Sequence, residues 1–407
     1  MLNYCVRNNV LGLEVYEMDV EIIVHNSGEL LPILLDDDGM PIPLPNEFIL
    51  SKRHASPNTL IRNLREIKLL YQWFQIHKIN LHERLIQKKP FTEAEITGSL
   101  VEFLRKDHEK RHKTIKIAVK PDTFNQRLIT IKQFLNWYIE MYIGTLPFTS
   151  NNYQYYITYK TRFISLLDRC FINSPPSNKS LNKGLTNQEK SELLRLIKPK
   201  LGSDNPIEHR NYIIVMLMIS FGLRPGELLS LRVEDIQIGG ISSITVKRRA
   251  PDVNDMRRPR PQIKRNGRVL DIIDRNLAIE IDLYITKWRE MLDQQNRTNI
   301  EWDYLILNES GTPLSLPSIT QYFQILRKKN YQSLPSTLSP KALRHTFSSS
   351  MERLLREAGV EEDNRKKALA YLRGDSSLSS QDVYTFKETE LEANKYLGQY
   401  QREIFGI

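Results

Sequence analysis

Apolar residues recur every three to four positions in two long stretches of this chain, as they do along one face of an α-helix. One stripe covers residues 60–74 and the other residues 129–138. Residues 212–223 are almost entirely apolar, which predicts a helix that is buried on all sides. Ahead of that segment, Thr186 and Glu189 have the spacing of a capping box and predict a helix start. Helices are therefore expected to dominate the chain.

Strands are expected only in short segments. Residues 11–25 alternate apolar and polar positions in part, and the prolines at positions 32, 41, 43 and 45 then predict turns or an extended linker. Residues 241–246 and 269–273 have the composition of two strands of a hairpin. The loop between them is the most basic part of the chain, with nine lysines and arginines against two aspartates in residues 247–268.

The order of these patterns predicts a mainly α fold with a small β-sheet, in the α+β class. Residues 1–54 are expected to form a β-rich or extended N-terminal appendage, and residues 55–172 a helical domain. Residues 173–184 contain serine, asparagine and a proline pair, which is the composition of a linker. Residues 185–407 are predicted as a second domain that ends in a helical C-terminal tail.

Charge and cysteine content narrow the class of partner. The chain has 58 lysines and arginines against 48 aspartates and glutamates, a formal net charge of +10, which favours nucleic acid before a membrane. Cys5 and Cys170 are far apart, which argues against a disulfide framework or a cysteine zinc site and fits a reducing compartment. We see neither a signal-peptide pattern nor an apolar run of the ~18 residues that a membrane helix needs. A cytoplasmic protein is expected, associated with the nucleoid if the source is bacterial.

Candidate chemistry comes from three separated patches. The first reads Gly-Leu-Arg-Pro-Gly-Glu-Leu, the second reads Lys-Ala-Leu-Arg-His-Thr-Phe, and the third ends at Tyr384. The first two supply Arg224 and Arg344, whose planar guanidinium groups match phosphate oxygens in pairs. A tyrosine hydroxyl can act as a nucleophile that keeps a broken strand covalently attached. Together these groups are suited to opening a phosphodiester bond.

The three patches resemble the motifs of the tyrosine recombinases, the phage-integrase family. That family has a Gly-Leu-Arg-x-x-Glu-Leu box, then His-x-Leu-Arg-His, then Leu-Gly-His-x-x with a tyrosine nine residues after the last histidine. Arg224 and Glu227 fit the first box, and Arg344 and His345 fit the second. The resemblance is good over residues 185–390.

The third patch aligns without a gap and places Tyr384 nine residues after Asp375. Two positions depart from the family pattern, because Lys341 and Asp375 stand where histidines are usual. A lysine still donates to a phosphate. A carboxylate repels a phosphate unless a cation pairs with it, and Arg373 is the expected partner.

The resemblance implies a helical core-binding domain followed by a recombinase catalytic domain. It implies a site-specific DNA recombinase or integrase that cuts and rejoins strands through a 3′-phosphotyrosyl intermediate, in integration or excision of a mobile element. No metal or other cofactor is expected. The implied partner is double-stranded DNA bound by a homotetramer, with accessory DNA-bending or directionality proteins as further candidates. The implied catalytic residues are Arg224, Lys264, Lys341, Arg344, Asp375 and Tyr384, supported by Glu227 and His345.

The general acid of the family is a lysine in the hairpin after the first box. Lys264 is assigned to this role because Lys-Arg-Asn-Gly-Arg resembles the family pattern before the returning strand, and Lys247 remains the alternative. The basic residues of the loop are expected to bind DNA, namely Lys247, Arg248, Arg249, Arg257, Arg258, Arg260, Arg265 and Arg268.

Tyr396 is a reserve candidate for the nucleophile. A recombinase relic that binds DNA but cuts it weakly is the alternative function, because two catalytic positions are altered. His108-Glu-Lys-Arg-His112 matches the zinc-protease pattern HExxH. This match is rejected because charged residues surround it and no third ligand is evident.

Overall fold

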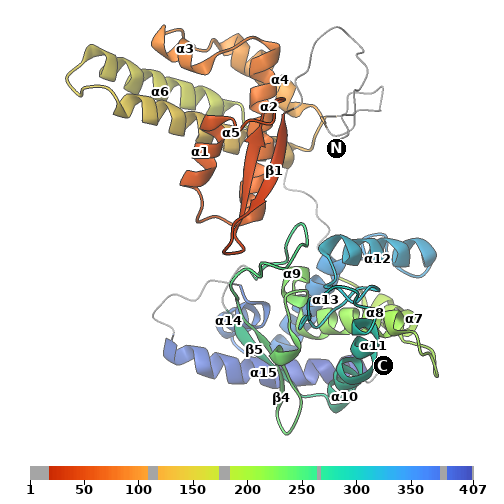
Figure 1. Cartoon of the computed structure of the whole chain (residues 1–407). Coiled ribbons are helices and arrows are strands. Elements are labelled where there is room, and N and C mark those ends of the chain that lie inside the picture. Colours follow the sequence, from red (N-terminus) through yellow and green to blue (C-terminus); the bar gives the residue numbers. More distant parts are fainter. Residues whose placement is uncertain (1–17, 109–117, 174–183, 264–266, 376–382, 406–407) are drawn as a thin grey trace. The chain divides into compact units, whose positions relative to one another are not determined.

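The computed structural model describes residues 18–108, 118–173, 184–263, 267–375 and 383–405, without the side chains of residues 383–391 and 405 (Figure 1). The chain divides into two compact units, residues 1–177 and residues 178–407, and each is described by itself. None of the described helices is long and apolar enough to cross a membrane.

The first unit begins with an antiparallel hairpin of β1 (Asp19–Val24) and β2 (Leu30–Leu35), followed by α1 (Pro43–Ser51). Pro32 was predicted to break the chain but lies inside β2. Both strands of a two-stranded sheet are edge strands, and an edge strand tolerates a proline because the missing backbone N–H can be on its unpaired side. Pro43, predicted to lie in a linker, starts α1 because a helix needs no N–H donor at its first position. The described part of the predicted appendage thus packs as regular structure.

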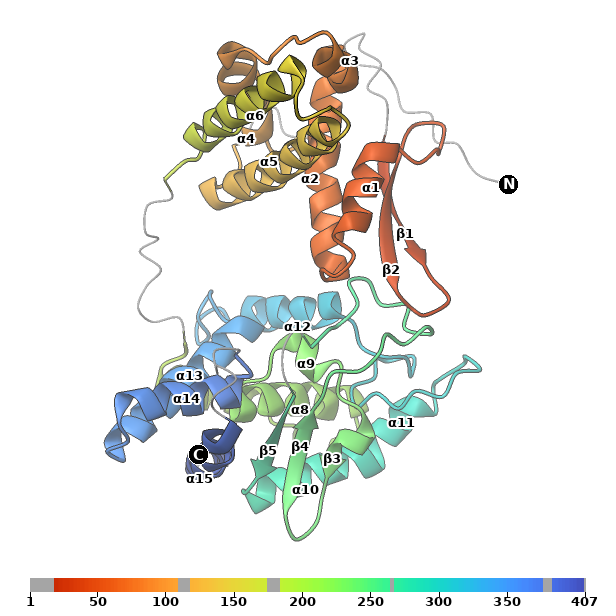
Figure 2. The same cartoon turned by 90° about the vertical axis from the view of Figure 1, so that its left-hand side faces the viewer.

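The rest of the first unit is helical, and the hairpin packs on α1 and α2 (Figure 2). Met18, Leu34 and Phe48 share one buried core with the apolar stripes of α2 and α5, which the sequence pattern predicted as helices. The helices are α2 (Pro57–Ile76), α3 (Leu81–Ile86), the π-helix η1 (Ala94–Leu100), α4 (Val101–Arg105), α5 (Pro121–Gly144) and α6 (Asn151–Arg169).

The second unit packs helices around a three-stranded sheet. Its strands are β3 (Ile236–Gln237), β4 (Ser242–Val246) and β5 (Arg268–Ile272), in antiparallel order β3-β4-β5. The helical elements are α7 (Asn187–Ile197), α8 (Pro206–Phe221), α9 (Pro225–Leu228), η2 (Val233–Asp235), α10 (Arg275–Leu283), η3 (Tyr284–Arg289), α11 (Glu290–Asp293), α12 (Leu316–Lys329), α13 (Pro340–Glu357), α14 (Glu362–Arg373) and α15 (Val383–Phe405).

Helix α8 is the centre of this unit, as its continuous apolar sequence predicted. Every residue from Tyr212 to Phe221 is buried, and α7, α13 and α15 pack against the helix. The capping box predicted from Thr186 and Glu189 is present at the start of α7. Because α8 has no polar face, it can only be accommodated with neighbours on all sides.

Helix α15 is fixed to the outer edge of β5 by two buried amide side chains. The Gln401 side-chain oxygen accepts from the backbone N–H groups of Ile273 (2.9 Å) and Asp274 (3.1 Å), and its amide nitrogen donates to the Asp271 carbonyl (3.0 Å). Asn394 accepts from the Asp271 N–H at 3.3 Å. Gln401 is fully buried, and its side chain satisfies the Asp271 carbonyl of β5 and two backbone N–H groups just after the end of that strand.

We expect Gln401→Ala to lower the free energy of unfolding of the second unit by about 1–3 kcal/mol, because backbone groups of β5 lose their partner in a buried place. Denaturant unfolding followed by circular dichroism measures the change. Gln399→Ala is the matched control, since Gln399 is exposed on the same helix. Equal effects of the two substitutions would contradict the bridging role of Gln401.

Candidate active site

The turn between α8 and α9 presents Arg224. Helix α8 ends at Gly222, whose φ of +61° is left-handed, and a Cβ atom there would lie 2.3 Å from the Phe347 ring. Only glycine therefore fits this helix end. Arg224 is the N-cap of α9, and the Glu227 carboxylate accepts from its backbone N–H (2.9 Å) and from its Nη1 (2.9 Å). The short helix thus orients the guanidinium of Arg224.

Helix α13 carries the second arginine. The Ser339 side chain caps its start by accepting from the Ala342 N–H, and Pro340 occupies the first turn. Arg344 follows one turn later and is 9% exposed. Its Nη1 donates to the Gly222 carbonyl at 2.6 Å, which satisfies an acceptor at the end of α8. The two arginine motifs are therefore joined directly.

Arg224 and Arg344 both contact the C-terminal end of α14. Gly374 closes the helix with a φ of +59°, and the Asp375 N–H bonds back to the Ala370 carbonyl at 2.8 Å, as in a Schellman motif. The Arg373 carbonyl accepts from Arg224 Nη1 (2.9 Å) and from Arg344 Nη2 (2.8 Å). Carbonyls at a helix C-terminus lack intrahelical partners and carry negative partial charge, so they stabilise cations.

Arg268, at the start of β5, ties the hairpin to the same place. Its Nε donates to the Leu372 carbonyl (2.8 Å), and its Nη1 and Nη2 donate to the two oxygens of Glu227 (3.3 and 3.0 Å). A Cβ atom on Gly374 would lie 2.4 Å from Arg268 Nη1, so this glycine also makes room for the pair. Arg268 is 5% exposed and its guanidinium is engaged within the protein, while its predicted contact with DNA stays a prediction.

Asp375 lies against three arginines. Its Oδ1 accepts from Arg224 Nη2 and lies 3.3 Å from Arg344 Nη2, and its Oδ2 lies 3.0 Å from Arg373 Nε. The predicted pair with Arg373 is present, but it is only one of the three. We call Arg224, Arg268, Arg344 and Arg373 with Glu227 and Asp375 the arginine centre.

Charges within the arginine centre shift two pKa values. Burial disfavours the ionised form of Glu227, but the charges and hydrogen bonds of Arg268 and Arg224 outweigh it and hold the pKa of Glu227 below its ordinary value. Burial, followed by the like charge of Arg224, lowers the pKa of Arg344 to about 10. At neutral pH Glu227 is therefore ionised and Arg344 remains a cation.

The other predicted catalytic residues have different places. Lys341 is exposed in the first turn of α13, and His345 is half-buried on the same helix. Tyr384 is the second residue of α15, but its side chain lies outside the described residues. Lys264 also lies outside them. The reserve nucleophile Tyr396 is buried in the core, which argues against that role.

Part of the basic loop folds back onto the protein. Arg257 pairs with Asp255 through two 2.9 Å contacts and donates to the carbonyls of Leu229 (2.9 Å) and Leu314 (3.0 Å). Arg260 is 5% exposed, and it and Arg258 donate to the Asp255 carbonyl. The sequence predicted all three arginines as DNA contacts, which stays a prediction, but it gave no sign that the loop supplies acceptors of its own.

The start of the loop is more accessible. Arg248 is exposed. Lys247 Nζ lies 3.2 Å from Glu234 Oε1, and Arg249 Nη2 lies 2.6 Å from the same oxygen. Both also approach Asp235. Arg265 lies outside the described residues.

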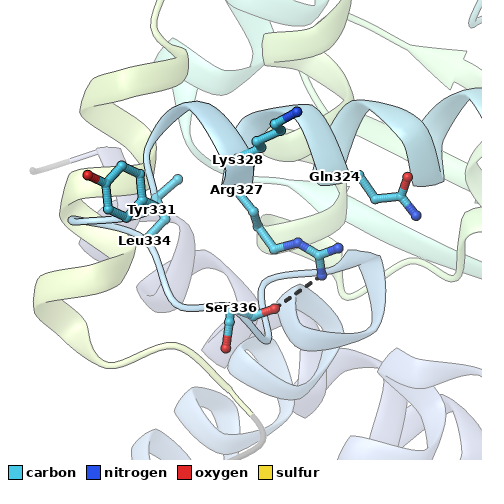
Figure 3. Close-up of a pocket in the computed structure, with 6 residues that line it drawn as sticks. All are labelled: Gln324, Arg327, Lys328, Tyr331, Leu334 and Ser336. Carbon is cyan, nitrogen blue, oxygen red and sulfur yellow. Dashed lines mark hydrogen bonds between the residues drawn. The ribbon is translucent and has the colours of Figure 1, made fainter.

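Two other features fall outside the arginine centre. His108 is occupied by the Phe103 carbonyl, to which its Nε2 donates at 2.9 Å, while Glu109 and His112 lie outside the described residues. The described residues contain no group of three or more potential metal-ligating side chains. A hollow of about 310 Å³ lies at the end of α12, where Arg327 points toward the Ser336 carbonyl (Figure 3). No member of the arginine centre lines it.

Comparison with known proteins gives three kinds of match. Residues 183–357 match the model of the phage integrase family. The tyrosine recombinase XerC of Roseiflexus castenholzii is 28% identical over 216 residues, which are 53% of this chain and 58% of that protein. Transposase A from transposon Tn554 of Staphylococcus aureus is 25% identical over 384 residues, which are 92% of this chain and 97% of the transposase.

Among solved structures, the Tn1549 transposon integrase in complex with circular intermediate DNA is 18% identical, with a TM-score of 0.44 over 86% of this chain and 97% of that one. The chain spans about three fifths of the length of the XerC relatives that it matches. The matched family segment contains both arginine motifs, which meet in the arginine centre. Residues 183–357 thus match the phage integrase family, and the relatives to which the chain is similar are tyrosine recombinases and a transposase.

Proposed function

We propose that this protein is a site-specific DNA recombinase or integrase of a mobile element. In the proposed reaction the Tyr384 oxygen attacks a DNA phosphate, the 5′ oxygen leaves, and a 3′-phosphotyrosyl bond holds the strand until a second 5′ hydroxyl displaces the tyrosine. The observation that carries the proposal is the convergence of Arg224 Nη2 and Arg344 Nη2 on a single oxygen atom. Two cationic donors aimed at one oxygen are suited to the charge that develops on a phosphate under attack.

The relatives agree with this function. One of them is named a transposase of transposon Tn554, and others are named tyrosine recombinases. We propose double-stranded DNA as the substrate and a homotetramer on DNA as the working assembly, with accessory proteins as further partners. We also propose that the arginines take the role that metal ions have in other phosphoryl-transfer enzymes, so that a chelator should leave cleavage unchanged.

Tyr384→Phe should abolish covalent attachment to DNA, because only the nucleophilic oxygen is removed. The measurement is trapping of a protein–DNA adduct on a nicked substrate built from the ends of the element that encodes the protein. Tyr396→Phe is the matched control and should keep forming adduct, since Tyr396 is buried on the same helix. An adduct that survives in Tyr384→Phe would refute this assignment of the nucleophile.

We propose Lys264 as the general acid. Both flanks of its segment are held beside the arginine centre: Ile263 is buried in the core, and Arg268 pairs with Glu227. A Cβ atom on Gly226 would lie 2.9 Å from the Gln262 carbonyl oxygen, so the chain before Lys264 runs directly against α9. The alternative, Lys247, pairs with Glu234.

Lys264→Ala should slow cleavage of ordinary DNA by about 10²-fold or more, the range for losing a general acid. It should cleave a substrate with sulfur at the 5′ bridging position near the wild-type rate, because a thiolate leaves without a proton at neutral pH. Lys247→Ala is the control and should show no such selective rescue. If the sulfur-containing substrate instead restored cleavage by Lys247→Ala, Lys247 would be the general acid.

We propose two roles for the basic residues of this loop. The exposed ones contact DNA, and the buried ones keep the residues of the arginine centre in position. Arg248→Ala should weaken DNA binding and reduce the slope of log affinity against log salt by about 1. Arg268→Gln should leave that slope unchanged while lowering the free energy of unfolding by about 3–5 kcal/mol, because it leaves a buried carboxylate without one of its partners. A reduced salt slope in Arg268→Gln would return this residue to the DNA interface.

A second candidate function is a relic that binds DNA and no longer cuts it efficiently. It is favoured by one observation, the carboxylate of Asp375 among the arginines that would bind the phosphate. Such a relic would bind the cognate ends with the expected salt dependence but form no adduct through Tyr384.

A further inference from the structure

Asp375 occupies the donors that a substrate phosphate needs. The Nη1 atoms of Arg224 and Arg344 are engaged within the protein, by Glu227 and by backbone carbonyls. Arg224 Nη2 donates to Asp375 Oδ1, and Arg344 Nη2, which also donates to the Arg373 carbonyl at 2.8 Å, lies 3.3 Å from the same oxygen. A phosphate oxygen held by the same two donors would have to take the position of this carboxylate oxygen.

The place is accessible to a competing anion. The side chains of Arg224 and Asp375 are 28% and 29% exposed, whereas Glu227 is 3% exposed. Glu227 is thus a built-in counterion, while Asp375 lies where solvent and ligands reach it. An ion pair with this exposure is only weakly stabilising, so a phosphate that offers its oxygens to the same guanidinium groups can compete with it.

The geometry also provides a second position for the carboxylate. The Schellman motif at Gly374 holds the backbone of Asp375, so its side chain is the part that can turn away. Its Oδ2 already lies 3.0 Å from Arg373 Nε. Rotation about this contact would release Oδ1 from Arg224 and Arg344 while one ion pair is kept.

We propose that Asp375 is an internal competitor of the substrate phosphate, which closes the arginine centre in the DNA-free protein and must be displaced before cleavage. The role of this competition in DNA cleavage rests on the proposed function. The competition between Asp375 and a phosphate for the arginines can be measured without DNA. Four arginines surround two carboxylates in the centre, so loss of the Asp375 charge leaves its cations less neutralised. A contact that draws the Asp375 side chain toward Arg373 would free Arg224 and Arg344 for a phosphate, so such a contact would regulate cleavage.

The test uses the full chain and inorganic phosphate as the probe. Phosphate is titrated at constant ionic strength, and its apparent Kd is obtained from the rise of the melting temperature, since a ligand that binds the folded state stabilises it. If the open arrangement is populated about 10% of the time, Asp375→Asn should bind phosphate about tenfold more tightly than the wild type. Asp375→Ala is the second variant, in case the asparagine variant does not fold.

Two controls locate the effect. Asp303→Asn neutralises an aspartate that pairs with Arg232 away from the arginine centre and should leave the phosphate affinity unchanged. Adding Arg224→Ala to Asp375→Asn should remove the gain. Unchanged or weaker phosphate binding in both Asp375 variants would overturn the proposal, as would a gain that survives Arg224→Ala.

Adduct formation on the cognate DNA separates this inference from the proposed function. If Asp375 competes with the phosphate, Asp375→Asn should form the Tyr384 adduct faster than the wild type. If no protein forms an adduct but phosphate binding follows the expected order, competition stands and the recombinase proposal fails. If the wild type forms adduct but neither Asp375 variant binds phosphate more tightly, the recombinase stands and the competition is refuted.

Discussion

The carbonyl groups at the C-terminal end of α14 are the acceptors on which the site depends. Leu372 and Arg373 direct their carbonyls at Arg268, Arg224 and Arg344, which come from a strand, a turn and another helix. Buried arginines repel one another unless acceptors compensate them, and here a helix end and Glu227 do so. The left-handed glycines at the ends of α8 and α14 are what allow these elements to approach.

This arrangement explains why a mostly helical unit keeps a small sheet. The hairpin of β4 and β5 adds four buried residues to the core, Ile244, Val246, Leu270 and Ile272. Its first β5 residue is Arg268, whose guanidinium joins Glu227 to α14. The loop before it is fixed by Arg257 on two backbone carbonyls and on the Tyr304 ring. The described residues on both sides of positions 264–266 are therefore anchored within the second unit, Ile263 in the core and Arg268 on Glu227.

The sequence predicted much of this architecture and less of the site's electrostatics. Apolar periodicity located α2 and α5, a continuous apolar run located α8, and the capping box located the start of α7, because these signals are local. The two arginine motifs were found through their resemblance to a family. The internal hydrogen bonds of Arg257 and Arg268 depend on acceptors far away in the chain, such as Leu314 and Leu372, so composition alone could not predict them. The crowding around Asp375 is likewise a long-range property.

The closure of β5 by α15 has a consequence for assembly. An exposed strand edge is a common place for another chain to attach by adding a strand. Here Gln401 and Asn394 already occupy the backbone groups of that edge. A neighbouring subunit could add a strand to β5 only by first peeling away α15, which also carries Tyr384. Strand addition at this edge would therefore displace the helix that carries Tyr384.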